Sequence, residues 1–408
     1  MTATPAESSA PVLDDPRVDG ESSLIGGLRR SGALRAFVPP AYGGRDETVA
    51  EVAERISALS ARDADTGWLA AIAAVTNLAV SEFPPAALGE IWGTDPDVLI
   101  AGTLAPAGTL VRTGGERVVD GGGVAGGGGV VDGGGVVDAV STPASGLPFA
   151  RWVMATVSET VLPAAGSPGA SSTRLVRVLV PRDQVEVELT WSATGLRGAG
   201  GDTAVLRRLA VPEHRARVLP PPGDEAPLTF FASLFFSAAV VGMARGAADV
   251  VRAAVDSAVG SAVLGPTTGT GPATGAGPAA GAGPTTGTAA ASRWARPDVR
   301  VTTSAALRRV DHVEALLAGA LTGLTTRDSI DRAGARERAR RADLAVSAAT
   351  EAEAAVPGLL ESIGTASLDP AHPLARAHRD VTTGARHTAL SVAKAALASE
   401  SALFEGIR

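Results

Sequence analysis

Histidines gather near the end of this chain, where three of its five lie within residues 372–387. Histidine titrates near neutral pH, so it can serve as a general acid, a general base or a hydrogen-bond donor. The apolar spacing predicts one helix over residues 374–404, which places His387 in its middle and allows Arg376 to pair with Asp380 one turn later. The same spacing also fits a salt-bridged surface helix. These residues alone do not distinguish a catalytic site from a solvated helix face.

Composition limits which chemistry can occur. The 408 residues include no cysteine, which excludes disulfides, thiolate ligands and a cysteine nucleophile, and the five unevenly spread histidines predict no metal site. A net charge of −7 argues against a nucleic-acid partner. No apolar run reaches the roughly 18 residues that a membrane span needs, and residues 1–20 lack the pattern of a signal peptide. We therefore expect a cytoplasmic protein without a membrane partner and with a disordered tail over residues 1–20.

The elements that must position the histidines fall into three segments. Residues 21–97 show helical apolar spacing and predict an N-terminal helical domain. Residues 98–218 contain short β-branched runs between glycines and prolines, which predict a central β domain of barrel or sandwich type. Residues 219–408 are helical again and predict a C-terminal four-helix bundle. The expected fold class is therefore α+β. Helices are expected at residues 22–31, 48–61, 69–80, 229–262, 301–321, 326–356 and 374–404, and from Pro84 to Trp92.

Two low-complexity stretches interrupt this pattern. Residues 265–288 repeat Gly-Pro-x-x-Gly-x four times without a large apolar side chain, so we expect a flexible insert over residues 265–290 of the bundle. Residues 120–138 are glycine-rich but lack the lysine and the following helix of a phosphate loop, so a glycine-expanded hairpin is preferred. In the bundle, Pro357 and the loop before Pro373 are expected to separate the last two helices.

A series of short motifs runs through nearly the whole chain. The motifs are Pro39-Pro40-Ala41-Tyr42-Gly43-Gly44, Asp65-Thr66-Gly67-Trp68, Ala105-Pro106-Ala107-Gly108, Ala144-Ser145-Gly146 with Ala150-Arg151-Trp152-Val153, Thr194-Gly195-Leu196-Arg197-Gly198-Ala199-Gly200, Val211-Pro212-Glu213-His214-Arg215, Gly242-Met243-Ala244-Arg245-Gly246-Ala247, and His372-Pro373-Leu374 with Arg379-Asp380 and His387. Each motif is short and unspecific alone. Their order resembles the acyl-CoA dehydrogenase fold superfamily, and more specifically its two-component (group D) flavin-dependent monooxygenases.

The resemblance implies a reduced-flavin-dependent monooxygenase. Such a protein takes reduced FMN or FAD from a separate NAD(P)H:flavin reductase and combines it with O2 to form a C4a-hydroperoxyflavin. One oxygen atom is then transferred to a small molecule, here expected to be an aromatic or polyketide-type specialised metabolite, as in antibiotic biosynthesis. The protein supplies orientation, exclusion of water and a few hydrogen bonds. Relatives are mostly homotetramers, so a homotetramer is expected here.

The resemblance also assigns residues to the flavin side of the site. His387 matches a terminal-helix histidine near the reaction centre and Ser145 matches a serine beside flavin N5 and C4a, so both are expected to be catalytic. Ser145, Thr142 and Arg293 are expected to bind the cofactor, Arg293 through the phosphate, because a planar guanidinium can bind two oxygens. The alternatives are an ordinary turn serine and a surface histidine.

The substrate side departs from the family pattern. Many relatives carry a substrate-facing histidine in the helix that follows Thr-Gly-Trp, whereas residues 75–78 read Val-Thr-Asn-Leu. Trp68 and Asn77 of this helix are expected to line the substrate pocket. The departure leaves two alternatives open. One is a dehydrogenase-like or non-redox enzyme, such as a cyclase or dehydratase, that reuses the pocket, and the other is a non-enzymatic binding subunit.

Overall fold

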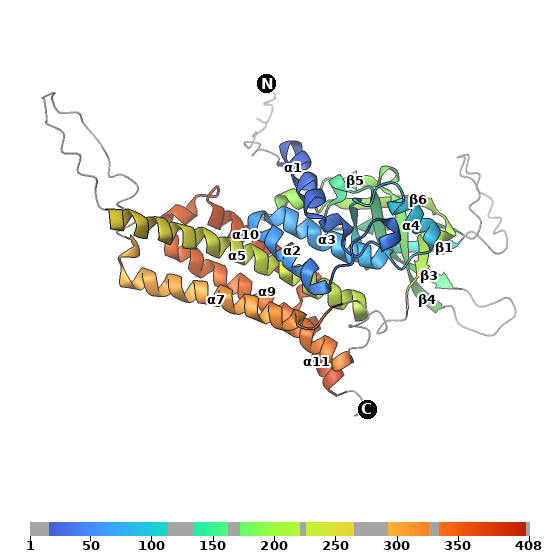
Figure 1. Ribbon diagram of the computed structural model, residues 1–408. Coiled ribbons are helices and arrows are strands. Elements are labelled where there is room, and N and C mark those ends of the chain that lie inside the picture. The colour runs from blue at the N-terminus through green and yellow to red at the C-terminus, as the bar shows by residue number, and fades with distance from the viewer. Residues whose placement is uncertain are drawn as a thin grey trace, which may run out of the picture. The chain divides into compact units, whose positions relative to one another are not determined.

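The structure is a computed structural model that describes residues 16–112, 134–161, 172–220, 226–264, 293–325 and 334–404 (Figure 1). The chain divides into two compact units, one built from residues 1–46 and 72–225 and the other from residues 47–71 and 226–408. Helices precede and follow a group of strands along the chain, which confirms the α+β class. The glycine-rich stretch up to residue 133 and the predicted insert up to residue 290 lie outside the described residues.

Helices of the first unit begin close to where the sequence predicts them. Helix α1 (Pro16–Ser31) starts at Pro16 rather than at residue 22, so residues 16–20 belong to a helix and not to the predicted tail. Proline is tolerated at a first helical position because its missing N–H has no partner there in any case. Helix α4 (Pro85–Trp92) also begins with a proline, as predicted, and buries Trp92.

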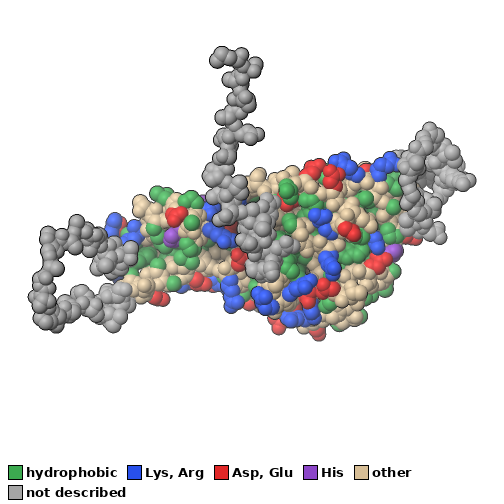
Figure 2. All heavy atoms as spheres, turned by 90° about the horizontal axis from the view of Figure 1, so that it is seen from above, with side chains coloured by type: hydrophobic (Ala, Val, Ile, Leu, Met, Phe, Trp, Pro, Cys, Tyr) green, Lys and Arg blue, Asp and Glu red, His purple; other side chains and the backbone are tan. Residues whose placement is uncertain are grey.

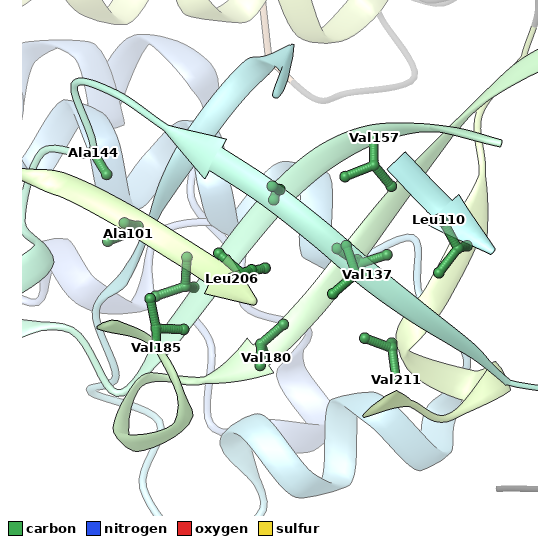
Figure 3. Close-up of a cluster of buried hydrophobic side chains, with 14 of the residues drawn as sticks. Ala101, Leu110, Val137, Ala144, Val157, Val180, Val185, Leu206 and Val211 are labelled. Carbon is green, nitrogen blue, oxygen red and sulfur yellow. The ribbon is translucent and has the colours of Figure 1, made fainter. Parts of the chain in front are cut away.

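Seven strands of the first unit form one mixed sheet in the order β5-β6-β2-β1-β3-β4-β7. Among the described strands, β1 and β3 pair in parallel, and the other pairs are antiparallel. Small apolar residues, valine and alanine, alternate along β3 and β4 on the face that contributes to a buried cluster. This cluster includes Val137, Val157, Val180 and Leu206 (Figure 3). The strands are β1 (Ile100–Arg112), β2 (Gly135–Ser141), β3 (Trp152–Val161), β4 (Ser172–Pro181), β5 (Glu186–Glu188), β6 (Thr203–Val211) and β7 (Ala216–Val218).

The second unit is a helical bundle. Its long helices α5 (Ala226–Leu264), α7 (Pro297–Leu321), α9 (Ala335–Ile363) and α10 (Pro373–Ala385) lie side by side (Figure 1). Val251, Val310, Leu359 and Leu374 contribute one apolar side chain from each of these helices to a common core. Helix α2 (Val49–Arg62) packs on α5 and begins with the capping box formed by Thr48 and Glu51. The predicted C-terminal bundle is confirmed.

Helix α5 contradicts the prediction that no apolar run is long enough to span a membrane. Its residues Leu228–Val259 are long and apolar enough to cross a membrane, although the sequence was expected to contain no such run. In the structure, 83% of the most apolar window of this helix is buried inside the protein. That burial is typical of a core helix, since alanine, glycine and serine allow neighbouring helices to approach α5 closely.

Two predicted helix boundaries in the bundle are wrong. Pro357 lies inside α9, which continues to Ile363, because buried Val356 and Leu359 on either side hold the helix despite the roughly 3 kcal/mol that an interior proline costs. The terminal helix predicted over residues 374–404 is broken into α10, the short 3-10 helix η8 (Thr388–Leu390) and α11 (Val392–Leu403). His387 therefore lies in the break and not in mid-helix.

Local capping explains the break. The backbone N–H of Arg386 turns back to the carbonyls of Thr383 and Gly384, which ends α10. The side chains of His387 and Ser391 then accept hydrogen bonds from Ala389 N and Lys394 N, and each starts a new helical segment. Such side-chain caps compete with continuation of a helix.

In Figure 2, charged side chains are scattered among apolar and uncharged groups. Cationic and anionic groups are interspersed on the face shown in Figure 2. Pairs such as Arg252 with Asp311 (2.6 Å) and Arg207 with Glu186 (2.9 Å) join neighbouring elements within one unit. Exposed pairs of this kind contribute little stability individually, so the apolar cores carry most of the fold.

Candidate active site

Three aromatic rings meet in the second unit around His387. The imidazole centroid lies 3.9 Å from that of Phe236 and 5.5 Å from that of Trp68, and the Trp68 and Phe236 rings are 4.9 Å apart. Gly384 leaves room for this cluster, since a Cβ there would lie 3.2 Å from the Trp68 ring. The structure thus brings two predicted site residues, Trp68 and His387, together.

A charge network positions the two helices that carry this cluster. Asp63 begins α3 (Ala64–Val80) by accepting hydrogen bonds from the Thr66 backbone N–H (2.8 Å) and hydroxyl (2.6 Å). The Arg376 guanidinium on α10 lies 3.3 Å from Asp65, 3.5 Å from Asp63 and 3.6 Å from Asp380. The predicted pairing of Arg376 with Asp380 is therefore confirmed. By joining α10 to the first turn of α3, the network fixes Trp68 relative to the end of α10.

Arg379, His372 and His378 stay outside the aromatic cluster. Arg379 donates to the Pro370 carbonyl (2.8 Å), and His372 caps α10 through its Nδ1, which accepts from Leu374 N (3.2 Å). Both contacts hold the start of α10 in place. Of the three neighbouring histidines, His387 is the one in ring contact with Trp68 and Phe236.

The hydrogen bond at Nδ1 determines what the His387 imidazole can do. Nδ1 accepts from the backbone N–H of Ala389 (3.2 Å), so the neutral ring carries its proton on Nε2 and can donate from there. Burial, and to a smaller extent the positive charge of Lys394, lower the pKa of His387 to about 4. Above about pH 5 the imidazole is therefore neutral, a hydrogen-bond donor rather than a cation.

This depressed pKa predicts a pH-dependent stability. Between pH 6.5 and 4, the unfolded chain binds a proton at His387 that the folded chain does not, so the free energy of unfolding falls as the pH falls. Lowering the pH from 7.5 to 5.0 should cost the wild type about 1–2 kcal/mol more than a His387→Asn variant. Urea unfolding of both proteins at both pH values measures the difference. Equal losses would show that His387 titrates normally.

The first unit holds Thr142 and Ser145 in a loop between β2 and β3. Ala144 N donates to Asp202 O (2.9 Å) and Gly146 N to Ala199 O (2.7 Å), which ties the loop to residues 199–202. The hydroxyls of Thr142 and Thr203 are 2.9 Å apart, and the Ser145 side chain is buried. Two hydroxyl groups are thus held in defined positions by a loop of fixed backbone. Their role toward a flavin stays a prediction.

Asn77 also lies in the first unit, on the later part of α3. Its side chain is fully buried, and its Nδ2 donates to the carbonyls of Leu34 and Ala36, both at 2.9 Å. These bonds anchor the segment that follows α1. Asn77 therefore has a structural role in holding this segment. Its place in the substrate pocket remains a prediction.

Replacing Asn77 with alanine should lower the free energy of unfolding by about 2–4 kcal/mol, because two buried carbonyls lose their donor and a cavity forms. Urea unfolding measures this loss, and substrate KM is measured on the same protein. Thr76→Ala is the matched control, since the Thr76 hydroxyl donates to Ile72 O and Ala73 O of its own helix. A raised KM with unchanged unfolding would instead place Asn77 against the substrate.

Arg293 caps the end of α9. Its Nε donates to Ser362 O (2.7 Å) and its Nη2 to Glu361 O (2.8 Å). A guanidinium that binds the last carbonyls of a helix is stabilising, because those groups have no partner inside the helix. The predicted contact of Arg293 with a flavin phosphate stays a prediction, and two of its donors already serve this cap.

Three residues of the site were missed from the sequence. Phe236 lies in a long apolar run, where helical spacing cannot tell a core residue from a site residue. Arg376 was predicted to pair with Asp380, and its further contacts with Asp63 and Asp65 were not predicted. Lys394 is the single lysine of the chain, and this composition is the one sequence feature that sets it apart.

Comparisons with known proteins agree with the fold and extend over most of the chain. Residues 280–392 match the family model "Acyl-CoA dehydrogenase, C-terminal domain". The oxygenase component of the FADH(2)-dependent resorcinol hydroxylase of Rhizobium sp. (strain MTP-10005) is 28% identical over 387 residues, which cover 91% of this chain and 84% of that protein. The oxygenase subunit HsaA of Rhodococcus jostii, a flavin-dependent monooxygenase, is 26% identical over 54% of this chain and 55% of its own length.

Among solved structures, XiaF from Streptomyces sp., in complex with FADH2 and glycerol, superposes with a TM-score of 0.72 at 24% identity, covering 97% of this chain and 92% of that chain. The chain therefore has the acyl-CoA dehydrogenase fold. Along most of its length the chain is similar to the oxygenase component of a FADH(2)-dependent hydroxylase, in line with the resemblance that the order of its motifs indicates.

The chemistry of the donors present fits a flavin. An isoalloxazine ring needs hydrogen-bonding groups along its polar edge and apolar surroundings elsewhere. In the first unit, the 141–146 loop provides the hydroxyls of Thr142 and Ser145 for such an edge.

Proposed function

We propose that this protein is the oxygenase component of a two-component monooxygenase. It takes reduced FMN or FAD from a separate NAD(P)H:flavin reductase and uses O2 to insert one oxygen atom into a small aromatic substrate. The observation that carries this proposal is the similarity to a resorcinol hydroxylase oxygenase component along 91% of the chain. The neutral, capped imidazole of His387 in an aromatic cluster supports it.

Each proposed site residue has a physical task. The reduced flavin, when bound, supplies the two electrons that activate O2. Ser145 and Thr142 orient the ring through their hydroxyls, and Arg293 binds the phosphate. His387 donates a hydrogen bond from Nε2 at the reacting centre, where neutrality at pH 7 avoids the cost of a buried charge. Trp68 and Phe236 keep water away from that donor.

The cavity beside His387 suits a small substrate. It has a volume of about 430 Å³ and is lined by residues of α9, α10, η8 and α11. Ligand pockets of this size accept molecules of one or two rings. We further propose that the protein is cytoplasmic, assembles as a homotetramer, and modifies a specialised metabolite such as an antibiotic precursor.

The test combines binding with turnover. The full-length protein is titrated anaerobically with dithionite-reduced FMN and FAD, and then supplied with a flavin reductase, NADH, catalase and a panel of phenols under ¹⁸O2. We expect reduced flavin to bind more tightly than oxidised flavin, and one product to carry a single ¹⁸O atom. Absence of reduced-flavin binding would defeat the proposal. Substrate conversion without O2 and reductase would favour the dehydrogenase-like or non-redox alternative.

A further inference from the structure

The cavity beside His387, called here the α9–α11 pocket, has a charged rim within the second unit. It lies between α9, the end of α10, η8 and the start of α11, and its walls include the apolar side chains of Leu390 and Val392. The polar side chains that matter for its charge are those of Glu353, Arg386, His387 and Lys394.

Two of the three formal charges of the pocket neutralise each other. Arg386 Nη2 lies 2.8 Å from Glu353 Oε1 and Arg386 Nη1 lies 3.2 Å from Glu353 Oε2, so the carboxylate is held by both arms of the guanidinium. The Glu353 side chain is 22% exposed, and this pair forms part of the pocket wall. A ligand therefore meets Glu353 as a neutralised group rather than as a free anion.

Lys394 is the remaining charge. The Lys394 side chain is exposed and lines the pocket. In the described part of the chain, its ammonium forms no ion pair with a carboxylate. Lys394 is also the single lysine in the sequence, where all other basic side chains are arginines. An ammonium on a flexible four-carbon stem can follow an anion at the rim of a pocket, whereas a guanidinium is a rigid planar fork. The pocket thus carries one uncompensated positive charge.

The remaining lining determines what kind of anion fits. The apolar side chains of Leu390 and Val392 offer contact to a ring, and about 430 Å³ holds one or two rings. His387 adds a neutral donor to the same wall. A small aromatic molecule with one negative group would satisfy the ammonium and the apolar wall together.

We propose that the α9–α11 pocket selects aromatic acids as substrates, with the ring against Leu390 and Val392 and the carboxylate on Lys394. Binding of an aromatic acid in this pocket requires neither flavin nor O2. That the bound acid is also a substrate rests on the proposed function. Lys394 is accordingly a specificity-determining residue, and His387 on the same wall is the neighbouring polar group.

The test compares two ligands that differ in charge but hardly in shape, 3-hydroxybenzoate and 3-hydroxybenzamide. Calorimetric titration of the full-length protein at pH 7.5 should give about tenfold tighter binding of the benzoate, and raised salt should reduce that preference. Lys394→Met, which keeps an unbranched apolar stem without the charge, should abolish the preference, while Lys394→Arg should retain most of it. An equal affinity of the wild type for both ligands would overturn the proposal.

The unique lysine allows a direct readout at the residue itself. Mass spectrometry of the peptide that contains Lys394 follows its acylation by an N-hydroxysuccinimide ester. The benzoate should slow this reaction and the benzamide should not. If FMN but not riboflavin protects Lys394, and the benzoate does not, the ammonium serves a cofactor phosphate and the substrate assignment is wrong. Selective benzoate binding without ¹⁸O incorporation would support the pocket and count against the monooxygenase.

Discussion

Replacing His387 with asparagine is expected to lower the rate of O2-dependent substrate turnover about 100-fold, while the affinity for reduced flavin stays unchanged. Asparagine is a good N-cap, so its side-chain oxygen can still accept from Ala389 N and preserve η8. The substitution therefore removes the Nε2 donor with little disturbance of the backbone. Because the imidazole is already neutral above pH 5, the wild-type kcat should not follow a His387 titration between pH 6 and 8.

Steady-state kinetics with a flavin reductase measure this loss, and anaerobic flavin titration shows whether the cofactor still binds. His312→Asn is the matched control, since His312 is exposed on α7. It should leave kcat and flavin affinity unaltered. Full turnover by the His387 variant would remove the residue from the proposed chemistry. Loss of flavin binding together with turnover would instead identify His387 as part of the cofactor site.

Replacing Gly242 with alanine is expected to reduce the free energy of unfolding by about 1–3 kcal/mol, although alanine is the better helix former. Gly242 lies on α5 where α2 crosses it, and a Cβ there would be 2.3 Å from the Ser57 carbonyl oxygen. Gly246, one turn later, meets Ala61 O at the same 2.3 Å. The two glycines let the backbones of α2 and α5 approach within a distance that no larger residue allows.

The control has the opposite expected sign. Gly319 lies in α7, and a Cβ added there meets no atom within 4 Å. Gly319→Ala should therefore raise the free energy of unfolding by up to about 1 kcal/mol through the lower entropy of the unfolded chain. Urea unfolding of both variants tests the pair. Stabilisation by both substitutions would show that α2 and α5 are less closely packed than the structure indicates.

Several elements were predictable because their causes are local. Thr48 and Glu51 form the capping box that begins α2, and Pro85 at a first helical position marks the start of α4. The short β-branched runs between glycines and prolines predicted strands, and β3 and β4 are among the strands that the structure contains. The glycines of the Gly242–Ala247 motif were recognised as a pattern, but their reason, the close crossing of α2, became visible only in the structure.

The candidate site was harder to predict because its contacts join distant parts of the chain. Periodicity placed His387 in mid-helix, whereas two side-chain caps break the helix there and turn the imidazole toward Trp68 and Phe236. The sequence could not show that Arg376 would join α10 to the first turn of α3.

The sequence by itself determined the order of helices and strands, the caps that begin α2 and α10, and the motif order that relates this chain to flavin-dependent monooxygenases. These follow from periodicity, proline and glycine, which act over a few residues. Only the tertiary structure decided that His387 is a largely enclosed, neutral donor. Its pKa and tautomer depend on burial, on the charge of Lys394 and on the Ala389 N–H, and burial is a property of the packed chain rather than of neighbouring residues.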